Sequence, residues 1–286
     1  MVTPVRRHRH RRRLVLVGGF VATLAVVAVV SIRCGTGPRR AAAPSTLSGS
    51  SSAQPALADR VAGRATPDEP ARAVNHKLLV IGASYTAGMG ASTPEHGYAY
   101  LLAGKLGASW TATVCGVPGT GFLNPGPERA GTYSQRIRAL APTLTPGLVL
   151  LQGGRNDLGY PQPLERKAIA STIELVQRRF PRARVVLLGA IPGDMPVPAE
   201  LRALESTYAT VARIAGIPFI DPLGQHWITI DNVHGYAGRV PGHPNDAGYE
   251  YIATRVADQL VRVIGAGQAV IAAAPTPAPA SGRNAA

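Results

Sequence analysis

Between residues 75 and 265, short apolar runs alternate with longer segments of helical spacing, and this alternation is the strongest constraint on the fold. Strands of a parallel sheet that is covered on both faces are apolar throughout, and each is followed by a helix that crosses back over the sheet. The pattern therefore predicts an α/β domain, a three-layer α/β/α sandwich around a five-stranded parallel sheet. The expected strands are 77–81, 110–117, 148–152, 184–188 and 217–220, and the expected helices are 98–106, 132–140, 164–180, 198–215 and 245–264.

The first 33 residues have the composition of a membrane-insertion or export segment. Residues 1–13 contain six arginines and no acidic residue, and the 19 residues from Leu14 to Ile32 carry no charge. A helix of this length spans about 28 Å, close to the hydrocarbon thickness of a bilayer, and the basic flank predicts a cytoplasmic N-terminus. We expect a single-pass signal-anchor at residues 1–33, with the remaining chain outside the cell membrane.

Three other kinds of export signal stay open. The stretch Ala41-Ala42-Ala43 fits a cleavage site that would release a secreted protein. Cys34 would be the modified residue of a lipoprotein, although Arg33 stands where a small residue is preferred. The arginine pairs near the N-terminus resemble a twin-arginine signal. Each alternative also places the domain outside the cytoplasm.

Two segments flank the expected domain and lack a hydrophobic period. Residues 34–74 and 266–286 are rich in alanine, proline and serine, which predicts flexible linkers and leaves 75–265 as the folded domain. The chain carries a net charge of +14, but residues 75–265 contribute only +4 of it. So small a surplus is not the footprint of a nucleic-acid-binding protein, and we expect no nucleic-acid partner.

The chain has two cysteines, Cys34 and Cys115. Cys34 lies next to the apolar run, whereas Cys115 falls within an expected strand. We interpret Cys115 as a small buried apolar residue and not as the disulfide partner of Cys34.

Four short motifs lie where the expected strands end or where the last helix begins. The carboxyl ends of parallel strands meet at one edge of the sheet, where such folds carry their functional groups. Ser84 then has the exposed turn position that an acyl-transfer nucleophile needs, and His243 supplies an imidazole that takes up the hydroxyl proton near neutral pH. The motifs are Gly82–Gly88, Gly116–Gly121, Gly153–Asp157 and Gly242–Tyr249.

In this order, the four motifs resemble those of the SGNH (GDSL-type) hydrolases, of the exported type that occurs in actinobacteria. The resemblance covers 75–265 and implies a flavodoxin-like fold and a serine esterase or acylhydrolase that forms an acyl-enzyme on Ser84. It also implies an oxyanion hole made by the N–H groups of Ser84 and Gly119 and the side-chain amide of Asn156. It implies no metal or organic cofactor, and its substrate would be a small-molecule or cell-envelope acyl ester.

The chain departs from the family pattern at two positions. The usual Gly-Asp-Ser reads Gly-Ala-Ser at residues 82–84, which removes a carboxylate that is not a member of the catalytic triad. Val240 stands where the family carries an aspartate, three residues before the catalytic histidine. Asp231 and His234 preserve that spacing nearby. If residues 235–243 are an insertion, either His234 or His243 is in the position of the base.

We expect His243 to be the base, because it is joined directly to the segment that begins the last helix. Asp231 is the candidate acid, since a triad is defined by geometry and not by spacing along the chain. Alternatively, a backbone carbonyl orients the imidazole and the enzyme works as a dyad.

Two other functions use the same residues or tolerate the missing aspartate. An acyltransferase would pass the acyl group from Ser84 to an envelope glycan instead of water. A catalytically impaired module would bind envelope glycans or lipids without turnover. Three aromatic residues on loops at the same edge of the expected sheet are candidates to line a substrate pocket, namely Tyr85, Trp227 and Tyr236.

Overall fold

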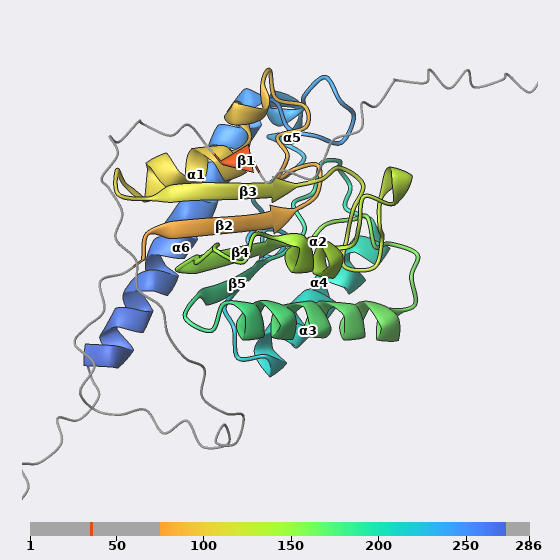
Figure 1. The fold of residues 1–286 in the computed structure, drawn as a ribbon. Helices are drawn as coiled ribbons and strands as arrows, with labels where there is room; N and C mark the ends of the chain where they lie inside the picture. The colour runs from red at the N-terminus through yellow and green to blue at the C-terminus, as the bar shows by residue number, and fades with distance from the viewer. Residues whose placement is uncertain (1–34, 37–74, 273–286) are drawn as a thin grey trace, which may run out of the picture. The chain divides into compact units, whose positions relative to one another are not determined.

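The computed structural model describes residues 35–36 and 75–272 of the chain. Its strands are β1 (Gly35–Thr36), β2 (Lys77–Gly82), β3 (Thr111–Gly116), β4 (Leu148–Gln152), β5 (Arg184–Leu188) and β6 (Phe219–Ile220). They form one sheet in the order β1-β3-β2-β4-β5-β6 (Figure 1). The strands β2 to β6 are parallel, and β1 pairs antiparallel with β3 at the edge.

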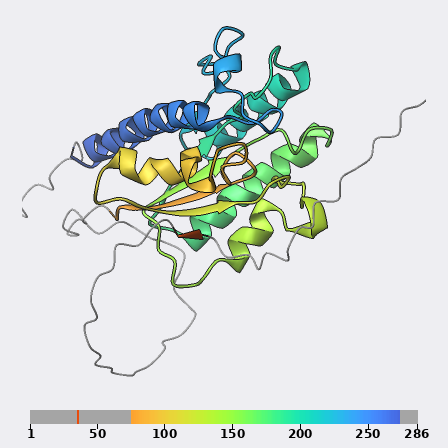
Figure 2. The same ribbon diagram turned by 90° about the horizontal axis from the view of Figure 1, so that it is seen from above.

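Helices cover both faces of this sheet. The helices are α1 (Tyr98–Leu106), α2 (Tyr133–Ala139), α3 (Gln162–Arg179), α4 (Ala199–Ile214), α5 (Val233–Tyr236) and α6 (Asp246–Ala272), with short 3-10 turns η1 (Pro94–His96) and η2 (Pro127–Arg129). α1 and α6 pack on one face, and α2, α3 and α4 pack on the other (Figure 2). The predicted three-layer sandwich with a five-stranded parallel sheet is therefore confirmed.

The strand β2, in the middle of the sheet, shows why the sheet needs a helix layer on each face. Alternate residues of a strand point to opposite faces, so Leu78 and Val80 join the core under α1 and α6, whereas Leu79 and Ile81 join the core under α2, α3 and α4. All four side chains are at most 1% exposed. Burying such a side chain fully stabilises the fold by about 1.5–3 kcal/mol relative to leaving it in water.

The strand order places the functional loops together. Along the parallel part of the sheet the order is β3-β2-β4-β5-β6, so the chain starts in an inner strand, adds a neighbour on one side and then continues on the other side. Doubly wound sheets of this order bind their ligands where the direction reverses, at the carboxyl ends of the strands. Here that point lies between β2 and β4, whose following loops contain Ser84 and Asn156.

Most element bounds agree with the sequence-based expectation, and the differences lie at the periphery. The helix 98–106 and the strands 148–152 and 184–188 have the expected bounds. β1 lies within the segment interpreted as a linker, α5 was not expected, and α6 continues to Ala272. The apolar run 14–32 lies outside the described residues. Within residues 75–272, no helix has the length and the apolar character needed to cross a bilayer.

The expectation that Cys115 is buried is confirmed, but the interpretation that it forms no disulfide is wrong, because Cys115 is disulfide-bonded. The residue is 5% exposed and lies in β3. Burial of an apolar sulfur and disulfide formation leave the same trace in a strand pattern, so the sequence alone did not separate them. The other cysteine of the chain, Cys34, lies outside the described residues.

Candidate active site

Ser84 lies in a tight turn that directly follows β2. The turn is closed by backbone hydrogen bonds from Ala87 N–H to the carbonyl of Ala83 and from Met89 N–H to the carbonyl of Ser84, both 2.9 Å. The side chain is partly exposed, and its Oγ lies 2.8 Å from Nε2 of His243, a residue 159 positions later in the chain. The two residues that the sequence selected as nucleophile and base are thus hydrogen-bonded to each other.

The second ring nitrogen of His243 determines how this hydrogen bond is polarised. Nδ1 lies 2.9 Å from the carbonyl oxygen of Pro241. A carbonyl oxygen only accepts, so Nδ1 carries the proton and Nε2 of the neutral ring is the acceptor for the hydroxyl group of Ser84. This is the tautomer that a general base needs.

Two contacts hold the segment that carries His243. The phenol of Tyr85 donates to the carbonyl oxygen of Gly242 at 2.7 Å, and its ring centroid lies 5.3 Å from that of His243. Burial raises the pKa of Tyr85, so the phenol keeps its proton at neutral pH. On the other side, Gly90 has φ +95° and approaches so closely that a Cβ there would meet the His243 Cβ at 2.9 Å.

The structure does not bring Asp231 to His243. Asp231 is an exposed residue in the turn before α5, and within the described chain it forms no hydrogen bond or ion pair with the imidazole. His234, on α5, is also exposed, and it is His243 that contacts Ser84. The position expected for the acid is taken by the Pro241 carbonyl, because the turn formed by Val240 to His243 folds that group back onto Nδ1.

The three expected oxyanion donors, on Ser84, Gly119 and Asn156, lie in the loops that follow the neighbouring strands β2, β3 and β4. In the described part of the chain, the N–H groups of Ser84 and Gly119 make no hydrogen bond. Gly119 has φ +75°, and a Cβ there would meet the Pro127 ring at 2.9 Å, so this turn requires glycine. The Asn156 amide donates one hydrogen to the carbonyl of Thr120 at 2.9 Å, and its second hydrogen has no acceptor among the described residues.

Asp157 is a structural residue of the site that sequence reasoning did not single out. Its carboxylate is buried, 3% exposed, and accepts the N–H groups of Phe122, Leu123 and Asn124 at 2.8, 3.0 and 2.9 Å. These bonds fix the loop after β3 against the loop after β4. The adjacency of Asp157 to Asn156 in the third motif was the available signal.

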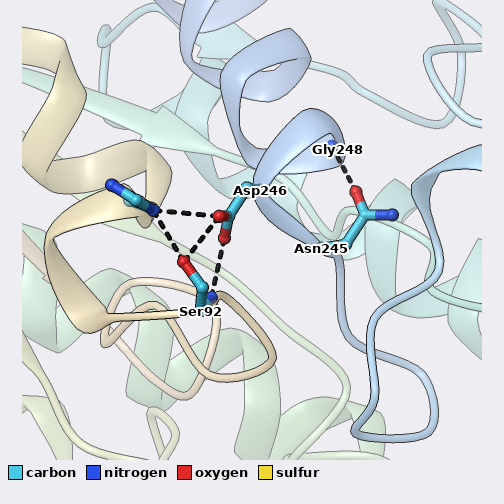
Figure 3. Close-up of polar contacts among 5 residues, drawn as sticks. Ser92, Asn245, Asp246 and Gly248 are labelled. Atoms are coloured by element: carbon cyan, nitrogen blue, oxygen red, sulfur yellow. Dashed lines mark hydrogen bonds and ion pairs between the residues drawn. The ribbon is translucent and has the colours of Figure 1, made fainter.

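A second serine, histidine and aspartate cluster lies near the site, but its geometry is different (Figure 3). Asp246 accepts both the N–H and the hydroxyl of Ser92, at 2.7 and 2.6 Å. Nδ1 of His96 faces both Asp246, at 2.9 Å, and Ser92, at 2.8 Å. In a triad the ring lies between serine and acid and uses one nitrogen for each, so this cluster is a clamp between two segments and not a relay.

The three aromatic residues expected to line a pocket differ in where they lie. Trp227 is fully buried in the core under α1 and α6, and Tyr236 stacks on Tyr251 with ring centroids 4.9 Å apart. Of the three, Tyr85 contacts the candidate base. Among the described residues, no group of three or more histidine, cysteine or acidic side chains is placed to hold a metal ion.

The folded domain that contains Ser84 and His243 is similar to known proteins. A profile of the GDSL-like Lipase/Acylhydrolase family matches residues 80–251. A GDSL lipase of Mycobacterium tuberculosis is 30% identical over 189 residues, which is 63% of this chain and 79% of that relative.

Solved structures at lower identity share the fold. The aryl esterase of M. smegmatis matches with a TM-score of 0.54 and 19% identity, over 65% of this chain and 98% of its own. A carbohydrate acetylesterase from Sinorhizobium meliloti matches with a TM-score of 0.54 and 18% identity, over 66% of this chain and 99% of its own. At these identities the solved structures support the architecture alone.

Proposed function

The chain belongs to the GDSL-like lipase/acylhydrolase family and is a serine ester hydrolase, and from this premise we propose that it works through an acyl-enzyme on Ser84. The observation that carries the proposal is the 2.8 Å hydrogen bond between Ser84 Oγ and His243 Nε2, in a ring whose other nitrogen is bonded to a carbonyl. A binding module has no need of this polarised pair.

In the acylation step, Ser84 Oγ attacks the ester carbonyl carbon while His243 Nε2 takes its proton. The new C–O bond forms, the carbonyl π pair moves to the oxygen, and the resulting oxyanion accepts the N–H groups of Ser84 and Gly119 and the free amide hydrogen of Asn156. The oxyanion then collapses, the bond to the alcohol oxygen breaks, and His243 returns its proton to the departing alkoxide.

Deacylation repeats these events with water as the nucleophile. His243 takes a proton from water as its oxygen attacks the acyl-enzyme, and the proton returns to Ser84 Oγ when the carboxylic acid leaves. The substrates we propose are esters that join a short acyl group to a phenol or to a hydroxyl group of a sugar. We base this proposal on the activities for which two proteins of the same fold are named, an aryl esterase and a carbohydrate acetylesterase.

Labelling with a fluorophosphonate probe tests the nucleophile. We expect the wild type to be labelled and to hydrolyse p-nitrophenyl acetate, and Ser84→Ala to do neither. Ser92→Ala is the matched control, because Ser92 also contacts a histidine and an aspartate but lies in the clamp. Labelling of Ser84→Ala at the wild-type level, or loss of labelling in Ser92→Ala alone, contradicts the proposal.

We also propose that the domain acts outside the cytoplasmic membrane, as exported members of the family do. The charge-free run 14–32 after an arginine-rich flank supports this location. The disulfide at Cys115 also supports it, because disulfides persist in oxidising compartments. Alkaline phosphatase fused after residue 286 should be active in intact bacterial cells. An inactive phosphatase fusion, together with a fluorescent fusion of a green fluorescent protein at the same position, would contradict a location outside the membrane.

A further inference from the structure

A buried positive charge lies behind the active site without an acidic partner. Arg136, on α2, is 3% exposed and forms no ion pair with any described residue. Burial lowers the pKa of its guanidinium group, but an arginine stays protonated in proteins. A buried unpaired charge is costly, and an apolar side chain of similar length would fill the same volume without that cost. Packing alone therefore does not account for Arg136.

The guanidinium group of Arg136 joins the two loops that carry the nucleophile and the glycine donor. Nη1 donates to the carbonyl oxygen of Cys115 at 2.7 Å. Nη2 donates to the carbonyl oxygen of Gly82 at 2.8 Å and to the hydroxyl oxygen of Thr120 at 3.0 Å. Gly82 ends β2 two residues before the nucleophile, and Thr120 directly follows the glycine that supplies the second oxyanion donor.

The same network extends to the third donor. The carbonyl oxygen of Thr120 accepts the Asn156 amide at 2.9 Å. Tyr133, on the same turn of α2, has its ring centroid 5.0 Å from the guanidinium carbon and donates its hydroxyl to the carbonyl of Gln152 at 3.0 Å. One turn of α2 therefore holds the ends of β2, β3 and β4 (Figure 1), the three strands whose following loops carry the proposed oxyanion donors.

We propose that Arg136 is a positioning residue for the oxyanion hole, and that its uncompensated charge stabilises the anionic tetrahedral intermediate. The inference rests on the acyl-enzyme chemistry proposed for Ser84. A fixed positive charge in a water-poor site interacts with the developing oxyanion much more strongly than with a neutral ester. Removal of the charge therefore lowers kcat and leaves KM nearly unchanged.

Two variants of Arg136 and one matched control test this role. Arg136→Met removes the charge and the hydrogen bonds, and Arg136→Lys keeps the charge. Arg179 is the control, because both arginines donate to backbone carbonyls, lie over an aromatic ring and have a buried Nε without a hydrogen-bond partner among the described residues. It stands at the end of α3, just before β5 begins, and thus at the edge of the sheet away from the active site.

We expect Arg136→Met to lower kcat for p-nitrophenyl acetate about 10–100-fold, less than the about 10²–10³-fold loss when a direct oxyanion donor is removed. KM should stay within about twofold, and the affinity for a boronic acid, which mimics the tetrahedral intermediate, should fall by the same factor as kcat. Arg136→Lys should recover a clear part of both losses. Arg179→Met should match the wild type in kcat, KM and boronic acid affinity.

Exhaustive fluorophosphonate labelling gives the concentration of reactive enzyme and separates this inference from the proposal beneath it. A wild type that is not labelled at Ser84 contradicts the acyl-enzyme. If the wild type is labelled and Arg136→Met keeps the wild-type kcat per labelled molecule, only the role of Arg136 is contradicted. The same holds if Arg136→Lys is as slow as Arg136→Met. If Arg136→Met does not fold, Arg136→Gln, which is neutral but still donates hydrogen bonds, takes its place.

Discussion

At the scale of single residues, the unusual feature is the backbone carbonyl that orients His243. The Pro241 carbonyl fixes the ring and its tautomer, as the carboxylate of a triad does. It differs in carrying no full negative charge with which to stabilise the imidazolium ion. Tyr85, through its bond to Gly242, holds the same turn from the other side. Orientation of the base thus depends on the turn around it and not on an acidic side chain.

This arrangement predicts that Asp231 is dispensable. Asp231→Ala should keep kcat/KM for p-nitrophenyl acetate near the wild-type value, because Nδ1 of His243 is already bonded to Pro241. His234→Ala should behave in the same way, whereas His243→Ala should lose about 10²–10⁴-fold, the usual contribution of a general base. A loss in Asp231→Ala as large as that in His243→Ala would restore Asp231 as the acid.

The residues of the site differ in how far the sequence could predict them. Ser84, Gly119, Asn156 and His243 each belong to a short motif, and it is the set of four motifs in this order, not any one of them, that selects these residues. The contact with Pro241 is made by a backbone atom and depends on the turn, which leaves no mark in residue types. In the sequence, nothing distinguishes Arg136 from other helical arginines, because its contacts with the strand ends are formed only in the folded protein.

At the scale of elements, the clamp of Ser92, His96 and Asp246 joins the turn after the nucleophile to the start of α6 (Figure 3). His243 stands three residues before Asp246, so the clamp fixes the segment that carries the proposed base against the segment that carries the proposed nucleophile. Asn245 adds a second restraint at the same helix end, where its side chain accepts the N–H of Gly248 at 2.8 Å.

The clamp predicts a stability difference that depends on pH. Hydrogen bonds from Ser92 lower the pKa of Asp246 from 3.8 to about 2. The carboxylate therefore contributes stability above the unfolded value, and this contribution is lost as the pH falls toward 2. Asp246→Asn should lower the melting temperature at pH 7, and the difference from the wild type should narrow between about pH 4 and pH 2.

A surface ion pair on the next turn of α6 supplies the control for that measurement. Lys105 and Glu250 are paired, and the Glu250 side chain is 58% exposed, so Glu250→Gln should change the melting temperature little. Equal destabilisation by Asp246→Asn and Glu250→Gln at pH 7 would show that Asp246 is an ordinary surface carboxylate.

The elements themselves divide into those with a local signal and those without one. Apolar strands such as β4 and helices with apolar spacing such as α1 place their apolar side chains in the core, and this burial leaves a pattern in the sequence. The sequence therefore predicts these elements with correct bounds. β1 is two residues long and exists only through its pairing with Val114 and Thr113 in β3. α5 has four residues, too few for a hydrophobic period to be seen.

At the scale of the whole molecule, one buried acid ties overall stability to pH. Glu205, on α4, is 5% exposed and accepts the N–H of Ala190 at 2.8 Å. Burial, together with the nearby Asp221, raises its pKa from 4.5 to about 9. The folded protein thus keeps a proton that the unfolded chain releases above about pH 4.5, so stability is highest below that pH and declines as the pH rises toward 9.

Replacement of Glu205 by glutamine should remove this decline, because the amide is neutral at every pH. In urea titrations, we expect the free energy of unfolding of Glu205→Gln minus that of the wild type to increase steadily from pH 5 to pH 9, because the wild type loses stability over this range and the variant does not. Glu174→Gln, at an exposed position on α3, should keep a constant offset over the same range. A constant offset for Glu205→Gln as well would mean that Glu205 is ionised in the folded protein.

Ser84, Gly119 and Asn156 follow three neighbouring strands, and that adjacency has a consequence for how the enzyme changes. Neighbouring strands lie about 4.8 Å apart, a spacing set by backbone hydrogen bonds, so the sheet acts as a ruler that fixes the width of the oxyanion hole whatever the side chains around it. Selectivity for substrate size then has to arise in the segments around the three strand ends. The segments after β5 and β6 also hold the candidate base, because Gly193 packs against Gly242 and the N–H of Gly238 donates to the carbonyl oxygen of His243 at 2.8 Å. A change of substrate range made there has to keep these contacts if the chemistry is to stay in place.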